Sequence, residues 1–539
     1  MNMKNGIDLQ QPSLWRIVNE GRTVLSTILR MTRRLILTKT MRTAINRGHR
    51  SRMILIGTGT PVIEGGPLFD ISMQSGAAES VKSTATPCKG ELRKMTPRQK
   101  KEYYTFVIPS ILAFALGGVY SIVDGFFIGH CLGDPGLASV TIGYPLAVLI
   151  QAVGTGLGLA GAIRYTIWGA QDRKEEQKKC YTAALLLLIL VSIVLTVIFL
   201  TQMYPILRFL GAEGDLLEMT AEYVRVLAIG TTLQLLATGL IPFMRNMGGT
   251  TYAMVSMILG FVVNIILDYV LVWHIPLGMS GAAWATVIGQ ASTTVAAILF
   301  LLRKKPGLRL PEIGEILSIW GEMFRVAVAP FGMTISPTIT LILMNRFLLL
   351  YGGEQAVAVY GCIDYVVAVI YLLLQGVGDG SQPVISEQYG EGNDAMSAAY
   401  RTMAYRTAGV ITVVCMAGLY LTRGLIGALF GASPETCLEV VKRLPLFLAT
   451  LIFVAFIRVT TSYLYATEKV ALSYVLVYTE PVLSLVACLL LPLKMGLDGV
   501  WVAIPCSQVL SGVIAFVIKQ NTDRRLAMTN RTVRHTEKQ

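Results

Sequence analysis

The chain carries the segment LGMSGAAWATVIGQ at Leu277–Gln290 and a second version of it, MGLDGVWVAIPCSQ, at Met495–Gln508. The offset between the two segments is 218 residues. Their alignment places Gly278, Gly281, Ala285 and Gln290 over Gly496, Gly499, Ala503 and Gln508. A glycine- and alanine-rich segment that returns after such an interval suggests that one structural unit occurs twice.

Two more pairs of segments keep nearly the same offset, of about 220 residues. The pairs are LGDPGLASVTIGY at 132–144 with YGGEQAVAVYGCID at 351–364, and FLGAE at 209–213 with LFGAS at 429–433. One such match arises easily by chance, whereas three in register indicate a duplication. Parallel repeats of this kind are typical of transporters in which two halves surround a central site.

The composition of the chain indicates a membrane protein. Of its 539 residues, 53% are hydrophobic and 15% are charged, and the mean hydropathy is +0.59. Soluble domains carry roughly 25% charged residues. An ordinary soluble enzyme, a secreted disulfide scaffold and a disordered chain are therefore excluded, and a chain that crosses the bilayer several times is expected.

Twelve apolar stretches follow one another with short polar breaks. They are 104–129, 137–168, 180–204, 219–246, 251–273, 281–302, 325–350, 355–386, 403–422, 437–466, 470–493 and 499–518. Each is close to the ~20 residues that one crossing requires, and lipid leaves no unpaired backbone amide tolerable, so they are predicted to be helices. The prediction is an all-α integral membrane protein with two six-helix lobes, 103–310 and 311–518.

Lysine and arginine concentrate in the loops that follow the even-numbered stretches and in the tail 519–539. Because cytoplasmic loops carry the excess of basic residues, we expect both termini to be cytoplasmic and the protein to be a multi-pass protein of the plasma membrane.

The formal net charge of +13 arises mainly from the N-terminal segment, since residues 1–100 hold 17 Lys and Arg but only 6 Asp and Glu. We expect residues 1–102 to be a poorly ordered basic extension. It is either a cytoplasmic tail or translated sequence upstream of a later start such as Met73 or Met95. No nucleic-acid-binding motif accompanies it, so no nucleic-acid partner and no function are assigned to it.

Four polar residues in the first half could meet at similar depth. Asp124, Asp268 and Thr286 each lie about five residues from the predicted outer end of a helix, or about 7–8 Å below the interface. Asn264 is one turn deeper on the same helix face as Asp268. Carboxylate, amide and hydroxyl oxygens suit a hard cation such as Na⁺, and a close carboxylate pair suits a proton. The alternative is that the two acids only face a watery vestibule.

The second half lacks this set, because Asn264 and Asp268 align there with Val482 and Val486. It has other polar residues in its apolar stretches, which could form ion pairs within the lobe or contact a substrate: Asp364, Asp379, Gln382 and Glu480, with Arg346 and Arg458. The glycine-rich segment Gly376–Asn393 is expected to allow close helix packing, with a hinge as the alternative.

Motifs for catalysis are not found. The chain has no GxxxxGK[ST], GxSxG or HExxH, and its eight cysteines form no CxxC. We therefore expect no enzymatic activity, no disulfide, no metal cluster and no cofactor other than a coupling ion.

Four segments resemble the multidrug and toxin extrusion (MATE) family, and GDGSQP resembles its branch of MepA-type export proteins. They are VIPSILAFALGGVYSIVDGFFIGHCLGDPGLASVTIGYP (107–145), YVRVLAIGTTLQLLATGLIPFMRNMGGT (223–250), NIILDYVLVWHIPLGMSGAAWATVIGQ (264–290) and QGVGDGSQPVISEQYGEGN (375–393). The resemblance covers about residues 103–518. It implies two lobes around a V-shaped cavity and cation-coupled export of drugs.

The resemblance also implies roles for individual residues. Asp124, Asn264, Asp268 and Thr286 match the family's cation site in the first lobe, and Pro109 matches a proline at which helix 1 bends. The alternative for Pro109 is a mere irregularity of the helix. A glutamate that some branches carry in helix 7 is absent from 325–350, so a coupling site of that kind is not expected in the second lobe.

These observations predict a monomeric secondary antiporter, not an enzyme, that exports amphipathic, often cationic small molecules in exchange for Na⁺ or H⁺. One alternative is a lipid-linked oligosaccharide flippase of the same superfamily, which would need basic residues around its cavity. The other is a passive channel, which would show a ring of pore-lining charges, or a membrane enzyme, which would show a catalytic cluster.

Overall fold

A computed structural model describes residues 95–536, and every regular element among them is helical. The helices are α2 (Pro97–Ala170), α3 (Lys174–Phe209), α4 (Gly214–Ile229), α5 (Thr231–Asn246), α6 (Thr250–Asp268), the π-helix η1 (Tyr269–His274), α7 (Gly278–Lys304), α8 (Ile313–Gly390), α9 (Asp394–Leu429), α10 (Pro434–Ala466), α11 (Val470–Leu490), α12 (Pro492–Met495) and α13 (Leu497–Thr536). Most of the predicted N-terminal extension lies outside the described residues.

The first described helix begins at Pro97, five residues before the end of that predicted extension at residue 102. Thr96 and Gln99 form a capping box there, in which each side chain bonds to the other residue's backbone N–H. Proline at the first helical position loses no hydrogen bond, because that N–H has no partner inside the helix. These local signals place the start of α2.

Two long helices each provide two membrane crossings. Helix α8 has 78 residues, which at the α-helical rise would extend about 117 Å if straight. Its backbone breaks at Gly353, with φ 68° and ψ −167°, and α2 breaks at Gly133, with φ 63° and ψ −161°. Such torsions suit glycine, which has no Cβ to clash. The offset of 220 residues between Gly133 and Gly353 is that of the repeat, and both glycines turn the chain in the same way.

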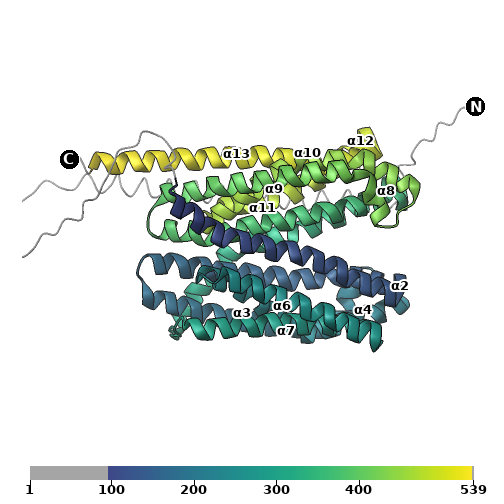
Figure 1. The fold of residues 1–539 in the computed structure, drawn as a ribbon, viewed down its shortest axis with the longest axis horizontal. Coiled ribbons are helices and arrows are strands. Elements are labelled where there is room, and N and C mark those ends of the chain that lie inside the picture. Colours follow the sequence, from purple (N-terminus) through teal and green to yellow (C-terminus); the bar gives the residue numbers. More distant parts are fainter. Residues whose placement is uncertain (1–94, 537–539) are drawn as a thin grey trace, which may run out of the picture. The chain divides into compact units, whose positions relative to one another are not determined.

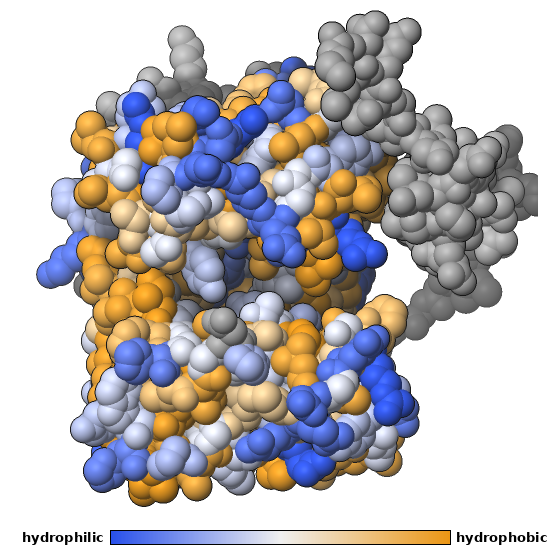
Figure 2. Space-filling view, turned by 90° about the vertical axis from the view of Figure 1, so that its right-hand side faces the viewer, coloured by the Kyte–Doolittle hydropathy of each residue, from blue (hydrophilic) through white to orange (hydrophobic). Residues whose placement is uncertain are grey.

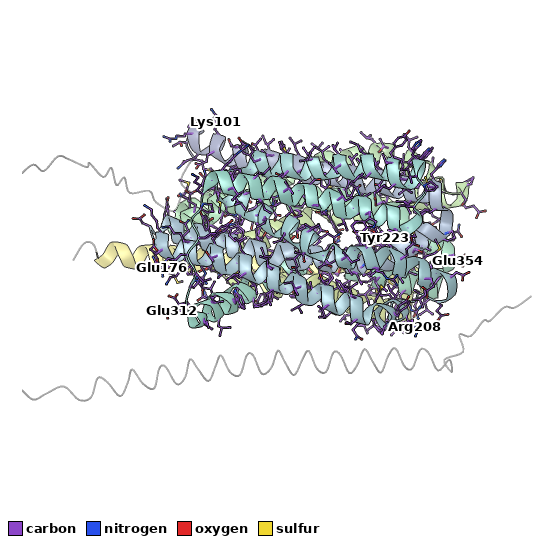
Figure 3. All side chains as sticks on the ribbon, turned by 90° about the horizontal axis from the view of Figure 1, so that it is seen from below. Lys101, Glu176, Arg208, Tyr223, Glu312 and Glu354 are labelled. Atoms are coloured by element: carbon purple, nitrogen blue, oxygen red, sulfur yellow. The ribbon has the colours of Figure 1, made fainter. Side chains whose placement is uncertain are left out.

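Within residues 95–536, ten helices are long and apolar enough to cross a bilayer, or eleven when the bent pair α4 and α5 is taken as one. This tally treats α8 as a single span, so the break at Gly353 raises the number to twelve, as predicted. Lys101, Glu176 and Glu312 lie at one end of the bundle, and Arg208 and Glu354 lie at the other (Figure 3). The chain therefore runs back and forth between two ends, and α2 begins at the end where α13 finishes (Figure 1).

The described helices form two groups, α2–α7 and α8–α13, seen as two layers in Figure 1. Other pairs of repeat-matched glycines confirm that the groups are related. Positive φ angles occur at Gly211 and Gly431, and also at Gly278 and Gly496. The fold class predicted from the sequence is confirmed.

The main contact between the two groups is made by α2 and α8. A Cβ on Gly376 would lie 2.7 Å from Ile111 Cα, and a Cβ on Gly380 would lie 2.8 Å from Val107 Cα. Only glycine permits backbones to approach so closely. The glycine-rich segment thus serves packing, as expected, near the end that carries the termini of the described chain. At the opposite end, the surface is hollowed between the groups (Figure 2).

Candidate functional site

The predicted polar cluster of the first half begins with the close contact of α6 and α7. A Cβ on Gly260 would lie 2.8 Å from the carbonyl oxygen of Gly289, so the two helices approach closely at this point. One turn along, Asn264 Nδ2 donates to Thr286 Oγ1 at 3.5 Å. Asn264 and Asp268 are buried on the same face of α6, at 2% and 0% exposure.

The third helix of the cluster is α2, which brings Asp124 to Asp268. The two carboxyl groups lie close enough to interact directly. Among the described residues, no lysine or arginine forms an ion pair with either acid. Four buried oxygens have no hydrogen-bond partner: one of Asp124, the amide oxygen of Asn264 and both of Asp268. Buried carboxylates without partners are costly, so this donor set fits a cation or a proton.

Two tyrosines that the sequence interpretation missed complete the cluster. Tyr120 lies one turn before Asp124 on α2 and stacks on Phe261, with the ring centroids 5.0 Å apart. Tyr223, on α4, interacts electrostatically with Asp124 and Asp268, and lies inside the bundle (Figure 3). The spacing of four residues could have identified Tyr120, whereas no sequence signal connects Tyr223 with the acids.

The helices around this cluster are longer or differently wound than predicted. Helix α2 runs to its break at Gly133, so Asp124 lies about 13 Å from that break rather than the predicted 7–8 Å from the end of the helix. The π-helix η1 begins directly after Asp268. π-Helical turns are rare and are frequently found at functional sites. The apolar pattern of this segment contains no signal for the change in winding.

Pro109 lies within helical backbone, because the only non-helical torsions inside α2 are those of Gly133. The chain next to it, Ser110 and Ile111, contacts α8 at Gly376. In this conformation α2 is thus not broken at Pro109, and the role of Pro109 as a hinge remains a prediction.

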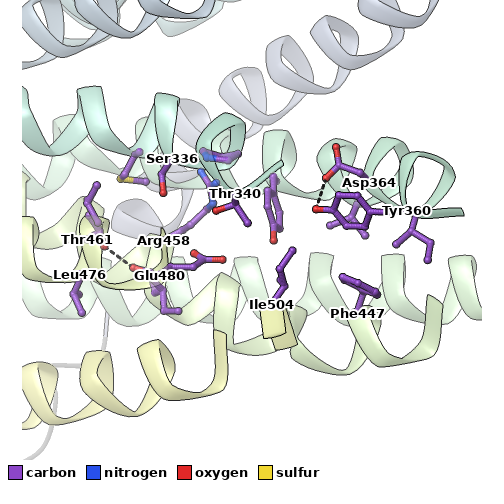
Figure 4. Close-up of a pocket in the computed structure, with 17 residues that line it drawn as sticks. Ser336, Thr340, Tyr360, Asp364, Phe447, Arg458, Thr461, Leu476, Glu480 and Ile504 are labelled. Carbon is purple, nitrogen blue, oxygen red and sulfur yellow. Dashed lines mark hydrogen bonds between the residues drawn. The ribbon is translucent and has the colours of Figure 1, made fainter. Parts of the chain in front are cut away.

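The polar candidates of the second half separate into two places. Asp364 and Glu480 line one cavity, together with Tyr360, Tyr371 and Arg458 (Figure 4). Tyr360 donates to Asp364 at 3.4 Å, and Gln508 donates to Glu480 at 3.2 Å. Aromatic rings beside carboxylates can hold a flat organic cation.

Asp379 and Gln382 do not line this cavity and instead contact the first group of helices. Arg245 on α5 forms an ion pair with Asp379 at 3.2 Å, and Asn246 donates to Gln382 at 2.8 Å. The predicted ion pairs were expected within one lobe, yet this pair joins two lobes. Its partner Arg245 lies 134 residues away in the sequence, and no repeat or spacing connects the two.

A family model described as MatE matches residues 109–270 and 331–490. Among curated relatives, a multidrug export protein MepA of Staphylococcus saprophyticus is 28% identical over 59% of this chain and 70% of its own length. A protein of the same name from Staphylococcus haemolyticus is 24% identical over 78% of this chain and 94% of its own length.

Solved structures of transporters share the fold. One is an outward-facing MATE family transporter of the MOP superfamily, with a TM-score of 0.74, 22% identity, and coverage of 80% of this chain and 97% of that chain. Another is a MOP superfamily transporter from Pyrococcus furiosus whose pocket is described as reversed in polarity, with a TM-score of 0.72 and 22% identity over 78% of this chain and 95% of that chain.

Proposed function

Because this chain belongs to the MatE family, we propose that it is a secondary active antiporter that exports amphipathic, often cationic drugs in exchange for Na⁺ or H⁺. Its relatives named multidrug export protein MepA support the export of drugs. The twelve apolar helices support a place in the cell membrane. The end that carries the described chain's termini is proposed to face the cytoplasm, since most loop lysines and arginines lie there.

One observation carries the coupling half of this proposal: Asp124 and Asp268 meet between α2 and α6 without a cationic partner. A buried carboxylate in a membrane helix is expensive unless it is protonated, paired or bound to a cation. The neighbouring oxygens of Asn264 and Thr286 would complete the ligands of Na⁺, and the same pair of acids could take up one proton.

In the proposed cycle, the coupling ion binds to these two acids from outside and changes the charge of the first group of helices. The groups then rearrange around α2, with Pro109 as the proposed hinge. Drug bound between the groups or in the second-half cavity is released outward. This exchange requires that ion and drug bind the two conformations with different affinity.

A lipid-linked oligosaccharide flippase is less well supported. The cavity in Figure 4 is lined by Asp364 and Glu480 with only one arginine, Arg458. An anionic pyrophosphate would meet two carboxylates there.

The test is ethidium efflux from vesicles that carry wild type, Asp124→Asn or Asp268→Asn, with Na⁺ and pH gradients imposed separately. Asp172→Asn is the matched control, because Asp172 is 84% exposed in a loop and pairs only with Lys174. We expect both buried variants to lose gradient-driven efflux while the control keeps it. Normal efflux by both buried variants would refute the coupling site, and movement of lipid-linked sugar without drug would favour the flippase.

A further inference from the structure

Arg245 and Asp379 form a buried ion pair between the two groups of helices. Arg245 lies at the end of α5 and Asp379 in the second half of α8, with 3.2 Å between Nη1 and Oδ2. Their side chains are only 4% and 3% exposed. The guanidinium also lies over the ring of Phe114 on α2, 5.3 Å from its centroid. Both charges are therefore enclosed by protein at the contact between the groups.

Polar contacts between the groups surround this pair. Asn246 accepts from Thr166 at 2.6 Å and exchanges amide hydrogen bonds with Gln382. Nearer the end of the bundle, Arg164 of the first group forms ion pairs with Glu322 at 2.6 Å and Glu468 at 3.1 Å, both in the second group. All of these contacts lie toward the end where α2 begins and α13 finishes, opposite the hollow of Figure 2.

A buried ion pair is a poor way to add stability, because both charges lose their hydration. It is a good way to favour one of two conformations. While the groups touch, each charge satisfies the other. If the groups separate at this end, water reaches both charges and replaces the lost bond, so neither conformation contains an unpaired buried ion.

The same ion pair is connected to the second-half cavity. Gln375 donates to Asp379 Oδ1 at 2.8 Å, and Arg458 donates to Gln375 Oε1 at 3.0 Å. Arg458 lines the cavity and lies over the ring of Tyr371, 4.9 Å from its centroid. A cation in the cavity would repel the Arg458 guanidinium and break its hydrogen bond to Gln375. Gln375 would then no longer be held in position to donate to Asp379.

We propose that Arg245 and Asp379 form an interlobe latch, which closes the end of the bundle carrying the termini and is weakened through Arg458 and Gln375 when a cation occupies the cavity. The latch rests on the proposed function only in requiring that the two groups separate at this end. It assigns to Asp379 a role in conformation rather than in binding the drug.

The experiment measures the distance between spin labels at Lys304→Cys, the last residue of α7, and Glu391→Cys, directly after α8, in full-length protein whose native cysteines have been replaced. Both positions are exposed, and they lie on different groups at the closed end. No ion gradient is imposed, so the result does not depend on transport. Efflux is measured separately, so that failure of the latch can be told from failure of the antiporter.

Four backgrounds are compared for the latch. Asp379→Asn breaks the pair, Arg245→Met with Asp379→Leu removes both charges without leaving one unpaired, and Arg245→Asp with Asp379→Arg exchanges them. Arg443→Gln is the control, because its pair with Asp498 lies at the other end and is partly exposed. We expect Asp379→Asn, which leaves Arg245 buried without its partner, to raise the ratio of long to short distances roughly tenfold, within the usual range of coupling between sites. The double neutral variant should keep the short distance, because two apolar side chains are stabilised by staying buried, but it should no longer open when a cation occupies the cavity. The exchanged pair should return toward wild type.

A wild-type distance distribution in Asp379→Asn would overturn the latch. If that variant fails to fold, a double neutral variant that opens with tetraphenylphosphonium as wild type does would overturn it instead. The connection to the cavity is tested with tetraphenylphosphonium, which should lengthen the distance in wild type but not in Gln375→Met. An equal response in both proteins would overturn that connection.

Discussion

The contact of Gly376 with Ile111 allows the most direct test of the interface between the groups. In Gly376→Ala, the new Cβ would lie 2.7 Å from Ile111 Cα and 3.0 Å from both Ile111 N and Ser110 O. Ordinary carbon contacts begin near 3.5 Å, so α8 must move from α2 by about 0.8 Å. No flexible side chain can absorb the shift, because all three atoms belong to the backbone.

The displacement of α8 in Gly376→Ala should lower the free energy of unfolding and slow transport. Overpacking of this kind costs about 1–3 kcal/mol, while the gain in helix propensity from glycine to alanine is about 1 kcal/mol. The net loss is therefore about 0–2 kcal/mol. Asp379 is nearly one turn further along α8, so the same movement would lengthen its 3.2 Å contact with Arg245. We expect a lower melting temperature and slower ethidium efflux.

Gly409→Ala is the matched control, because Gly409 lies inside α9 and a Cβ there meets nothing within 4 Å. It should be as stable as wild type or more stable. The assay is thermal unfolding of purified protein in detergent, together with efflux from vesicles. If Gly376→Ala is more stable than wild type, as the control is expected to be, then α2 and α8 do not approach as closely as the structure shows. That result would refute the argument.

Three further predictions concern the two polar sites and the loop beside the latch. Gly289→Ala places a Cβ 2.9 Å from Asn264 Cβ and should weaken coupling-ion binding without abolishing expression; unchanged ion dependence of efflux would contradict this. Asp364→Asn should raise the KM for a cationic drug roughly fivefold, since a partly exposed ion pair is worth about 1 kcal/mol, and should leave a neutral substrate unaffected; equal effects on both would count against it. Burial raises the pKa of Glu468, in the loop between α10 and α11, although Arg164 opposes the shift. The folded state therefore binds a proton at this group more readily than the unfolded state. Lowering the pH from neutral through the raised pKa should thus stabilise wild type relative to Glu468→Gln. The measurement is thermal unfolding of both proteins across this pH range, and the absence of such a trend would show that the carboxyl is exposed.

Part of the candidate site could be predicted because its members have local signals. Asp124 and Asp268 are acids inside apolar stretches, and the spacing of four residues places Asn264 with Asp268 on one helix face. Their meeting required two helices to pack in a given rotation, which hydropathy does not encode. Tyr223 could not be predicted as a member of the site, since one tyrosine in an apolar helix has many structural uses.

The sequence by itself determined the twelve helices, the two related groups and the positions of their matched turns, because bilayer thickness, backbone hydrogen bonding and the torsions of glycine act within short segments. Only the tertiary structure decided that Arg245 pairs with Asp379, that Asp364 and Glu480 share a cavity while Asp379 does not, and that the groups touch at one end and part at the other. These features depend on which helix faces meet across the interface. That choice is a balance of packing and desolvation summed over the whole chain, and no single stretch of residues carries it.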